Sequence, residues 1–154
     1  GNYVLNGAKA FISGGGDTDV LIVMARTGAS GPSGVSAFVV PAMLEGISFG
    51  RKENKMGWNS HSTRAIKFEN VRVPLENLLG KEGEGFKIAM RGLDGGRINI
   101  ATCSVGAAQG ALEAAHTYML ERKQFKQPLA SFQALQFKYA DMATHTVAAR
   151  QMVR

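Results

Sequence analysis

The stretch VRVPLENLLGKEGEGF, residues 71–86, separates two halves of the sequence with different patterns of apolar residues. Before it, runs of apolar and alternating residues are typical of β-strands, whereas after Gly85 apolar residues recur at helical spacing. Pro74 ends the last strand pattern, and a glycine-rich run follows it. We therefore expect an α+β chain, with a β-domain over residues 1–79 and the start of an α-helical domain over residues 80–154.

The first half contains apolar runs bounded by turn signals. Asn6-Gly7 lies between extended runs at residues 3–5 and 8–12, and this dipeptide is a strong signal for a β-hairpin. Further strands are predicted at residues 20–25, 35–40, 47–49 and 65–73. In the last of these, the alternation shifts between Phe68 and Val71. Because no helical pattern separates the strands, we expect a small antiparallel barrel or sandwich.

The second half predicts a long helix from Gly85 to about residue 121. Its unusual feature is Gly92 with Gly95 and Gly96 in the interior. An interior glycine destabilises a helix by roughly 0.5–1 kcal/mol relative to alanine. The glycines therefore indicate either tight helix packing or the close approach of a ligand to the backbone.

A polar connection at residues 121–129 leads to a final helix, for which Ser131 is a candidate N-cap. Its apolar stripe is expected to comprise Leu135, Met142, Ala149 and Val153, with Lys138, His145 and Arg150 away from the stripe. The sequence opens in a strand pattern and ends in a helical one, so we expect both ends to be cuts from a longer protein.

The composition predicts a folded chain with a basic surface. Hydrophobic residues make up 45% of the 154 residues, and the net charge is +6. The excess charge indicates either an ordinary basic surface or an anionic ligand such as a phosphate-bearing molecule. The basic residues are scattered and the apolar region at 98–115 is interrupted, so we expect neither a nucleic-acid nor a membrane partner. Cys103 is expected to be a buried thiol.

Several familiar kinds of catalytic site are excluded by the sequence pattern. A strand pattern, and no helix, follows the glycine run at residues 14–16, so a phosphate loop is excluded. The histidines, His61, His116 and His145, lack metal-ligand spacing, and no serine lies in a Gly-x-Ser-x-Gly motif. Trp58 is expected to pack in the fold. The residues alone thus predict a two-part chain with a glycine-marked helix and a basic connecting loop.

Five segments, in order along the chain, resemble the acyl-CoA dehydrogenase family. They are NGAKAFIS at 6–13, KMGW at 55–58, FENVRVP at 68–74, GKEGEGF at 80–86 and RKQFKQPL at 122–129. Three further segments, at 57–60, 93–101 and 140–143, are most similar to the branch of the family that oxidises isobutyryl-CoA. The resemblance covers essentially the whole chain.

The resemblance implies a homotetrameric FAD flavoprotein in which a β-domain is followed by a helical bundle. In this family a glutamate removes the α-proton of an acyl-CoA thioester, and the β-hydride passes to the flavin. The expected reaction oxidises a short, branched acyl-CoA to the 2,3-enoyl-CoA, and electrons then pass to an electron-transferring flavoprotein. Alternatives are an acyl-CoA oxidase or a non-catalytic interaction fragment. The expected compartment is the mitochondrial matrix in a eukaryote and the cytoplasm in a bacterium.

The resemblance also implies which residues bind cofactor and substrate. Phe11, Ile12 and Ser13 match the segment that lines the flavin ring, where a hydroxyl can hydrogen-bond the cofactor. The segment beside the acyl-CoA is matched by Asp94, Gly95, Gly96 and Arg97. Residues that match contacts to FAD, typically in a neighbouring subunit, are Arg122, Gln124, Phe125, Leu129, Phe132 and Gln133. Of these, Arg122 is expected to meet the pyrophosphate.

The sequence departs from the family pattern at three of these positions. Lys126 replaces a glycine, and Phe132 stands where a polar residue is common. Gly96 stands where one branch of the family carries its catalytic glutamate. We therefore expect no catalytic base in this chain, and place the base beyond Arg154.

Overall fold

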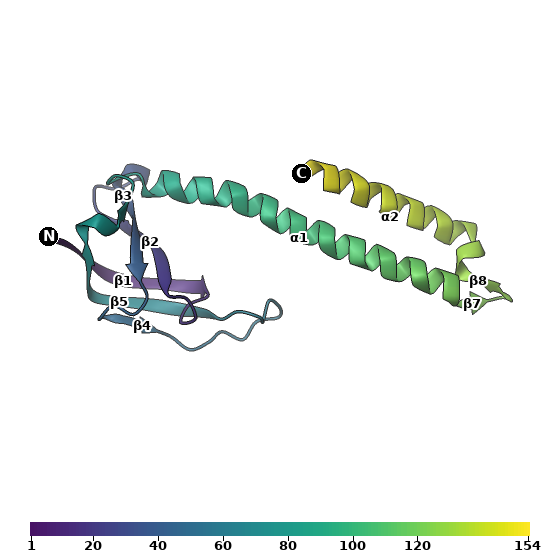
Figure 1. Cartoon of the computed structure of the whole chain (residues 1–154), viewed down its shortest axis with the longest axis horizontal. Coiled ribbons are helices and arrows are strands. Elements are labelled where there is room, and N and C mark those ends of the chain that lie inside the picture. Colours follow the sequence, from purple (N-terminus) through teal and green to yellow (C-terminus); the bar gives the residue numbers. More distant parts are fainter. The chain divides into compact units, whose positions relative to one another are not determined.

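The structure is a computed structural model that describes residues 1–154. The chain divides into two compact units, Gly1–Arg91 and Gly92–Arg154 (Figure 1). The first unit contains β1 (Asn2–Ser13), β2 (Val20–Arg26), β3 (Val35–Pro41), β4 (Ile47–Phe49), β5 (Thr63–Pro74) and β6 (Leu78–Leu79). Helix α1 (Gly85–Glu121) begins in it. The remaining elements are β7 (Lys123–Gln124), β8 (Gln127–Pro128) and α2 (Gln133–Met152).

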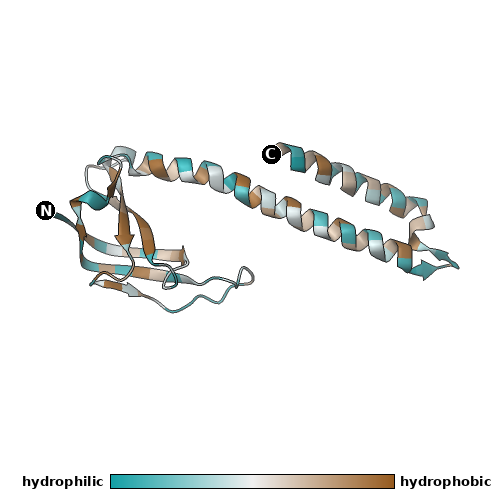
Figure 2. Cartoon of the chain, in the orientation of Figure 1, coloured by the Kyte–Doolittle hydropathy of each residue, from teal (hydrophilic) through white to brown (hydrophobic).

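The first unit is built from two three-stranded antiparallel sheets, in the orders β1-β5-β4 and β2-β3-β6. Side chains from both sheets share one core, and the residues of β2 and β3 are largely hydrophobic (Figure 2). The buried members of this core are Leu5, Leu21, Val23, Phe38, Val40, Ala42, Ile66, Phe68, Val71 and Val73. The predicted α+β class is confirmed, and the antiparallel part is a small sandwich.

The predicted hairpin at Asn6-Gly7 is wrong. Strand β1 continues through these residues and pairs with β5 on both sides of them. The side chain of Asn6 instead makes a cross-strand pair with Asn70: Asn6 Nδ2 donates to Asn70 Oδ1 at 3.2 Å, and the backbone N–H of Asn70 donates to Asn6 Oδ1 at 2.8 Å. Asn6 therefore hydrogen-bonds a residue of β5 that is distant in sequence, and forms no turn.

A β-bulge in β5 explains the shifted alternation of its sequence. Leu5 pairs with Val71 and Gly7 pairs with Phe68, so β5 contains one residue more than β1 across this step. Asn70 takes up the extra residue with a φ of 54°. The shift brings the apolar side chains on both sides of the bulge into the same core.

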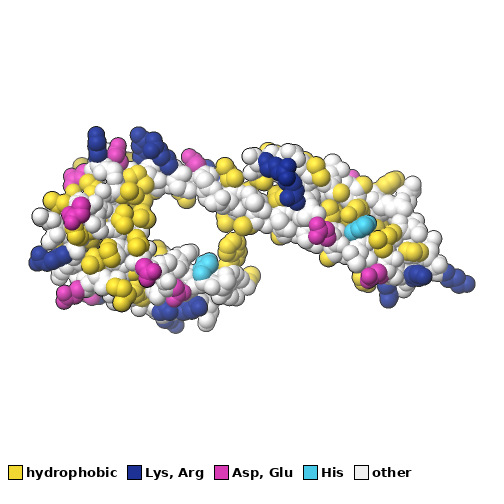
Figure 3. All heavy atoms as spheres, in the orientation of Figure 1, with side chains coloured by type: hydrophobic (Ala, Val, Ile, Leu, Met, Phe, Trp, Pro, Cys, Tyr) yellow, Lys and Arg dark blue, Asp and Glu magenta, His cyan; other side chains and the backbone are white.

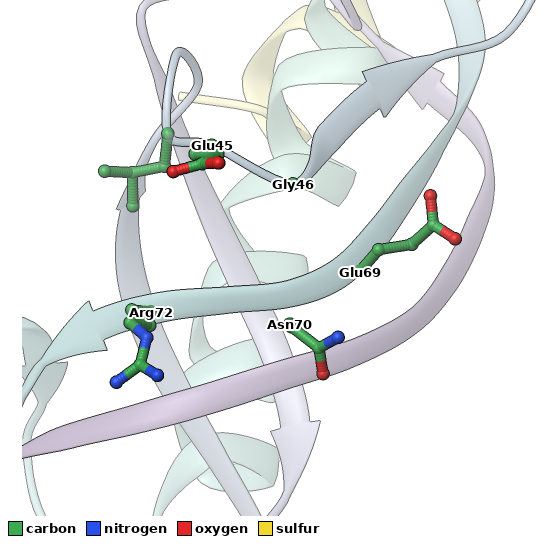
Figure 4. Close-up of a pocket in the computed structure, with 6 residues that line it drawn as sticks. Glu45, Gly46, Glu69, Asn70 and Arg72 are labelled. Atoms are coloured by element: carbon green, nitrogen blue, oxygen red, sulfur yellow. The ribbon is translucent and has the colours of Figure 1, made fainter.

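The same bulge shapes a surface pocket opposite the segment that leads into β4. Gly46, with a φ of 87°, lies so close to β5 that a Cβ there would be 2.2 Å from the carbonyl oxygen of Glu69. Glu69, Asn70 and Arg72 of β5 line this pocket together with Leu44, Glu45 and Gly46, and the side chains of Asn70 and Arg72 point away from Gly46 (Figure 4). The pocket contains none of the residues expected to bind cofactor or substrate.

The start of α1 is fastened to β3 through Ser36. This side chain is fully buried, and its Oγ accepts a 2.9 Å hydrogen bond from the backbone N–H of Gly83. Gly85, the first residue of α1, is also buried, and a Cβ there would lie 2.5 Å from the carbonyl carbon of Ser36. The glycine-rich run after Pro74 thus permits close packing of backbone on backbone.

In the second unit, α1 and α2 pack as a helical pair. The rings of His116 and Tyr139 lie 5.4 Å apart, and Arg150 Nη2 donates to Gln109 Oε1 at 3.0 Å. The prediction that Arg150 lies away from the packed stripe is wrong, because its polar head finds a partner on α1. Neither helix combines the length and apolarity needed to cross a bilayer.

Three local predictions in the second unit are also wrong. Phe132 occupies the N-cap position of α2, because a 3₁₀ turn takes up Leu129–Ser131. Met142 is 44% exposed, whereas Thr146 is buried. Cys103, expected to be buried, is exposed.

Candidate functional site

The residues expected to line a flavin ring lie at a second β-bulge, in β1. Lys9 pairs with Ile66 and Ile12 pairs with Arg64, so β1 holds the extra residue at this step. Phe11 has a φ of 55°, and its side chain is 75% exposed. A bulge re-aims a side chain that would otherwise follow the strand alternation. Here it presents an aromatic ring to the outside of the sandwich.

After the bulge, Ile12 and Ser13 of β1 pair again with β5. Ile12 is half-buried and packs against the core, whereas Ser13 is exposed and pairs with Thr63 in the register of the sheet. Ser13 also lies at the edge of a mainly apolar surface pocket that includes Leu21 and Val23 from the other sheet. Phe11 and the Ser13 hydroxyl are therefore both available to a ligand.

The glycine run after Ser13 is a turn that leads into β2. Gly14 and Gly16 have φ values of 74° and 84°, which glycine adopts without steric strain. The carbonyl of Gly14 accepts a 2.9 Å hydrogen bond from the N–H of Asp17. The strand predicted after this turn is confirmed, since β2 begins at Val20.

Sequence reasoning missed Ser62, which holds this turn in place. Ser62 is fully buried, its Oγ donates to the carbonyl of Gly15 at 2.8 Å, and its own carbonyl accepts from Gly14 N–H at 2.8 Å. Its N–H donates to Asp17 Oδ2 at 3.3 Å. Hydrogen bonding from Ser62, with the positive charges of Arg64 and Lys52, lowers the pKa of Asp17. No local pattern could have revealed these contacts, because Ser62 is distant from the turn in sequence.

The residues expected beside the acyl-CoA lie together on α1. Arg97 Nη1 lies 4.0 Å from Asp94 Oδ1, and both side chains are 77% exposed. A Cβ added at Gly92, Gly95 or Gly96 would meet no atom of the helical pair within 4 Å. Packing between α1 and α2 therefore does not account for these glycines, which leave a stretch of bare helix backbone.

The six residues expected to reach FAD are gathered at the connection between α1 and α2. Strands β7 and β8 form a hairpin, and Leu129 N–H donates to the carbonyl of Arg122 at 2.8 Å, closing the connection. At its tip, Phe125 and Lys126 have φ values of 51° and 65°, as in a type I′ turn. Lys126 stands where the family pattern has a glycine, and its backbone has a conformation that glycine adopts more readily than lysine.

Most of these side chains are directed outward. Arg122, Gln124 and Gln133 are exposed, and Phe125 is 86% exposed. Phe132 is half-buried, and its ring meets that of Phe125 edge-on at a centroid distance of 6.2 Å. Lys and Arg side chains cluster at this end of the helical pair (Figure 3). The hairpin is therefore an exposed, basic and partly aromatic surface suited to an anionic ligand.

The prediction that Trp58 packs in the fold is wrong. Its side chain is 64% exposed, and its φ is 55°. Lys55 holds the loop around it, since Lys55 Nζ donates to the carbonyls of Trp58 at 2.7 Å and His61 at 3.0 Å. The loop is therefore organised by a lysine, with the indole directed outward.

Comparison with known families finds two matches along the chain. Residues 1–71 match the acyl-CoA dehydrogenase middle domain, and residues 83–154 match the acyl-CoA dehydrogenase C-terminal domain. The chain belongs to the acyl-CoA dehydrogenase family. It is 59% identical over 154 residues to the mitochondrial isobutyryl-CoA dehydrogenase of Dictyostelium discoideum, and 56% identical over 153 residues to that of Bos taurus. These alignments cover 99% of this chain and 37% of each relative.

Solved structures agree with the fold. Butyryl-CoA dehydrogenase from Megasphaera elsdenii superposes with a TM-score of 0.94 at 46% identity, over 99% of this chain and 40% of that one. A chain from a structure of the electron transferring flavoprotein of Acidaminococcus fermentans gives 0.92 at 52% identity, with 99% and 40% covered. An acyl-CoA dehydrogenase complexed with FAD from Bacillus anthracis gives 0.87 at 42% identity, with 99% and 26% covered.

Proposed function

We propose that this chain is part of an FAD-dependent acyl-CoA dehydrogenase that oxidises a short, branched acyl-CoA to the 2,3-enoyl-CoA. The observation that carries this proposal is the 59% identity, across the chain, to a relative named isobutyryl-CoA dehydrogenase. The chain spans 37% of that relative's length, so the activity belongs to the longer protein. An electron-transferring flavoprotein is the proposed electron acceptor, supported by the match to a chain in a structure of that name.

The bulge in β1 fits a flavin ring. Phe11 presents an exposed aromatic face, and the exposed hydroxyl of Ser13 follows on the same strand with Ile12 anchored in the core between them. Bound FAD would supply the acceptor for the substrate hydride. Phe11 would pack on the ring, and Ser13 would donate a hydrogen bond to it.

The hairpin between α1 and α2 fits the polar part of FAD. The guanidinium of Arg122 can donate two parallel hydrogen bonds to a pyrophosphate. Gln124, Phe125 and Gln133 provide neighbouring exposed contacts. Leu129 and Phe132 are half-buried and support the hairpin from behind. We assign this surface to the FAD of a neighbouring subunit, and propose a homotetramer.

The bare stretch of α1 fits an acyl-CoA. Because Gly95 and Gly96 carry no side chain and nothing from α2 covers them, a thioester and its pantetheine arm can approach the backbone there. Asp94 and Arg97 flank this stretch on the exposed face of the helix. Gly96 offers no acid–base group, so the proton-abstracting residue is assigned to a part of the protein outside this chain.

Domain boundary and compartment complete the proposal. We place the boundary between Leu79 and Gly80, which lies in the interval between the two family matches. For a eukaryotic source we propose the mitochondrial matrix, supported by the mitochondrial names of the relatives, and for a bacterial source the cytoplasm.

The proposal is tested with the full-length protein purified with FAD. Anaerobic addition of isobutyryl-CoA is expected to bleach the flavin absorbance, and to do so faster than butyryl-CoA. Reoxidation is expected to require an electron-transferring flavoprotein and to be slow with oxygen alone. Failure of every short acyl-CoA to reduce the flavin would remove the proposed activity, and rapid reoxidation by oxygen would indicate an oxidase.

The assignment of Arg122 has its own test in the same protein. Arg122→Ala is expected to weaken retention of FAD during dialysis, because a charged contact to the pyrophosphate is lost. Lys138→Ala removes an exposed positive charge from α2 without altering the hairpin, and serves as the matched control. Equal FAD retention in the two variants would refute the role of Arg122.

A further inference from the structure

A buried serine, Ser62, lies directly behind the strand end that carries Ser13. The two segments meet at the start of β5, where Ser13 pairs with Thr63. Ser62 makes three hydrogen bonds to the turn that follows Ser13. Its backbone carbonyl accepts from Gly14 N–H at 2.8 Å, and its backbone N–H donates to Asp17 Oδ2 at 3.3 Å. Its side-chain Oγ donates to the carbonyl of Gly15 at 2.8 Å. One residue thus contacts three positions of a single short turn.

These hydrogen bonds restrain the backbone of a turn that has few other restraints of its own. The turn is rich in glycine, which has the largest range of backbone conformations to lose on folding. Ser13 is the last residue of β1, so the sheet restrains it on its N-terminal side, whereas Ser62 restrains the chain on its C-terminal side. The Ser62 side chain is fully buried, so water cannot replace its bond to Gly15 without rearrangement.

We propose that Ser62, assisted by Asp17, is a positioning residue that holds the Ser13 hydroxyl in place for flavin reduction. This inference rests on the proposed function, in which Ser13 contacts the flavin. Ser62 itself would touch neither the cofactor nor the substrate. It acts through the backbone of the turn, and Asp17 orients Ser62 by accepting its N–H.

The test is a double-mutant cycle in the full-length holoenzyme, measured as the rate of flavin reduction by isobutyryl-CoA. Ser13→Ala and Ser62→Ala are each expected to slow reduction by about fivefold, the factor that corresponds to one neutral hydrogen bond. Together they are expected to slow it no more than Ser13→Ala alone. Ser60→Ala, an exposed serine on the same loop, is the matched control and should reduce flavin at the wild-type rate.

The outcomes separate this inference from the proposed function. Additive losses in the double variant would show that Ser62 supports the fold in general and would overturn the positioning role. A full rate in Ser62→Ala with a reduced rate in Ser13→Ala would overturn it while leaving the role of Ser13 intact. A full rate in Ser13→Ala would overturn both, and absence of any flavin reduction in the wild type would overturn the proposed function itself.

A second pair of variants covers the case in which Ser62→Ala fails to fold. Asp17 is exposed, so its replacement leaves the core unchanged. Asp17→Asn keeps an oxygen that can accept the Ser62 N–H and is expected to reduce flavin within about twofold of the wild-type rate. Asp17→Ala removes that acceptor and is expected to lose more. Equal rates in the two variants would contradict the proposal.

Discussion

The phenol of Tyr3 donates a 2.5 Å hydrogen bond to Oε1 of Glu82, joining the first strand of the sandwich to the segment that precedes α1. The hydrogen bond to Glu82 raises the pKa of Tyr3 above its ordinary value of 10.0, because the carboxylate stabilises the protonated phenol. The ring of Tyr3 meets Phe38 of the core edge-on at 4.8 Å. A polar contact at the surface is thus tied to the packed interior.

This contact predicts how stability changes at alkaline pH. A group whose pKa is raised in the folded state stabilises the fold below its unfolded pKa of 10.0, and this contribution is lost as the pH rises through the folded value. Titration of phenolate absorbance is expected to show Tyr3 ionising above pH 10.0. Glu82→Gln should bring Tyr3 back toward 10.0. An unchanged Tyr3 titration in that variant would contradict the assigned cause.

Asp17 predicts the opposite dependence at acidic pH. Its pKa is lowered from 3.8, first by hydrogen bonding from Ser62, so it stabilises the fold above 3.8 and that contribution disappears as the pH falls through the lower folded value. A carboxyl-carbon NMR titration is expected to find the midpoint of Asp17 below 3.8. A midpoint at or above 3.8 would exclude the interaction with Ser62.

Gly85→Ala is predicted to destabilise the first unit. The added Cβ would lie 2.5 Å from the backbone of Ser36, and backbone cannot move aside as a flexible side chain can. We expect a loss of about 1–3 kcal/mol in the free energy of unfolding, measured by urea denaturation. Gly57→Ala, where a Cβ meets nothing within 4 Å, is the matched control and should be neutral. Equal stability of the two variants would exclude the close packing.

Lys126→Gly is predicted to stabilise the hairpin between α1 and α2. Lys126 has a φ of 65°, which a residue with a Cβ adopts at a free-energy cost and glycine adopts freely. We expect a gain of about 0.5–1 kcal/mol, seen as slower hydrogen exchange of the Leu129 amide that closes the connection. Lys123→Gly, on the paired strand β7, should have the opposite effect. Faster Leu129 exchange in Lys126→Gly would show that the turn is unstrained.

The sequence predicted elements that have a regular internal period. Strand β5 and the long helix α1 were both predicted, and even the bulge in β5 was visible as a shift between Phe68 and Val71. The hairpin at Asn6-Gly7 was wrong because a local turn signal was outweighed by pairing with β5 along the whole strand. The pairing of β1 with β5, which are far apart in the sequence, determined the conformation of Asn6-Gly7.

The candidate site divides in the same way. Residues 122–133 were grouped as FAD contacts through the family resemblance, and in the structure a short hairpin brings these near neighbours together. Ser62 could not be assigned to the Ser13 strand, since the contacts that join them depend on the sheet register. Arg150 was likewise misplaced, because the partner that draws it toward α1, Gln109, lies on a different helix.

The glycines of α1 have a consequence for how the chain unfolds. The boundary between the two compact units falls between Arg91 and Gly92, and three residues of low helix propensity, Gly92, Gly95 and Gly96, follow within five positions. Helix formation spreads from residue to residue, so a weak stretch interrupts its cooperativity. The sandwich and the helical pair are therefore expected to melt as two separate transitions, even though a single continuous helix runs through both.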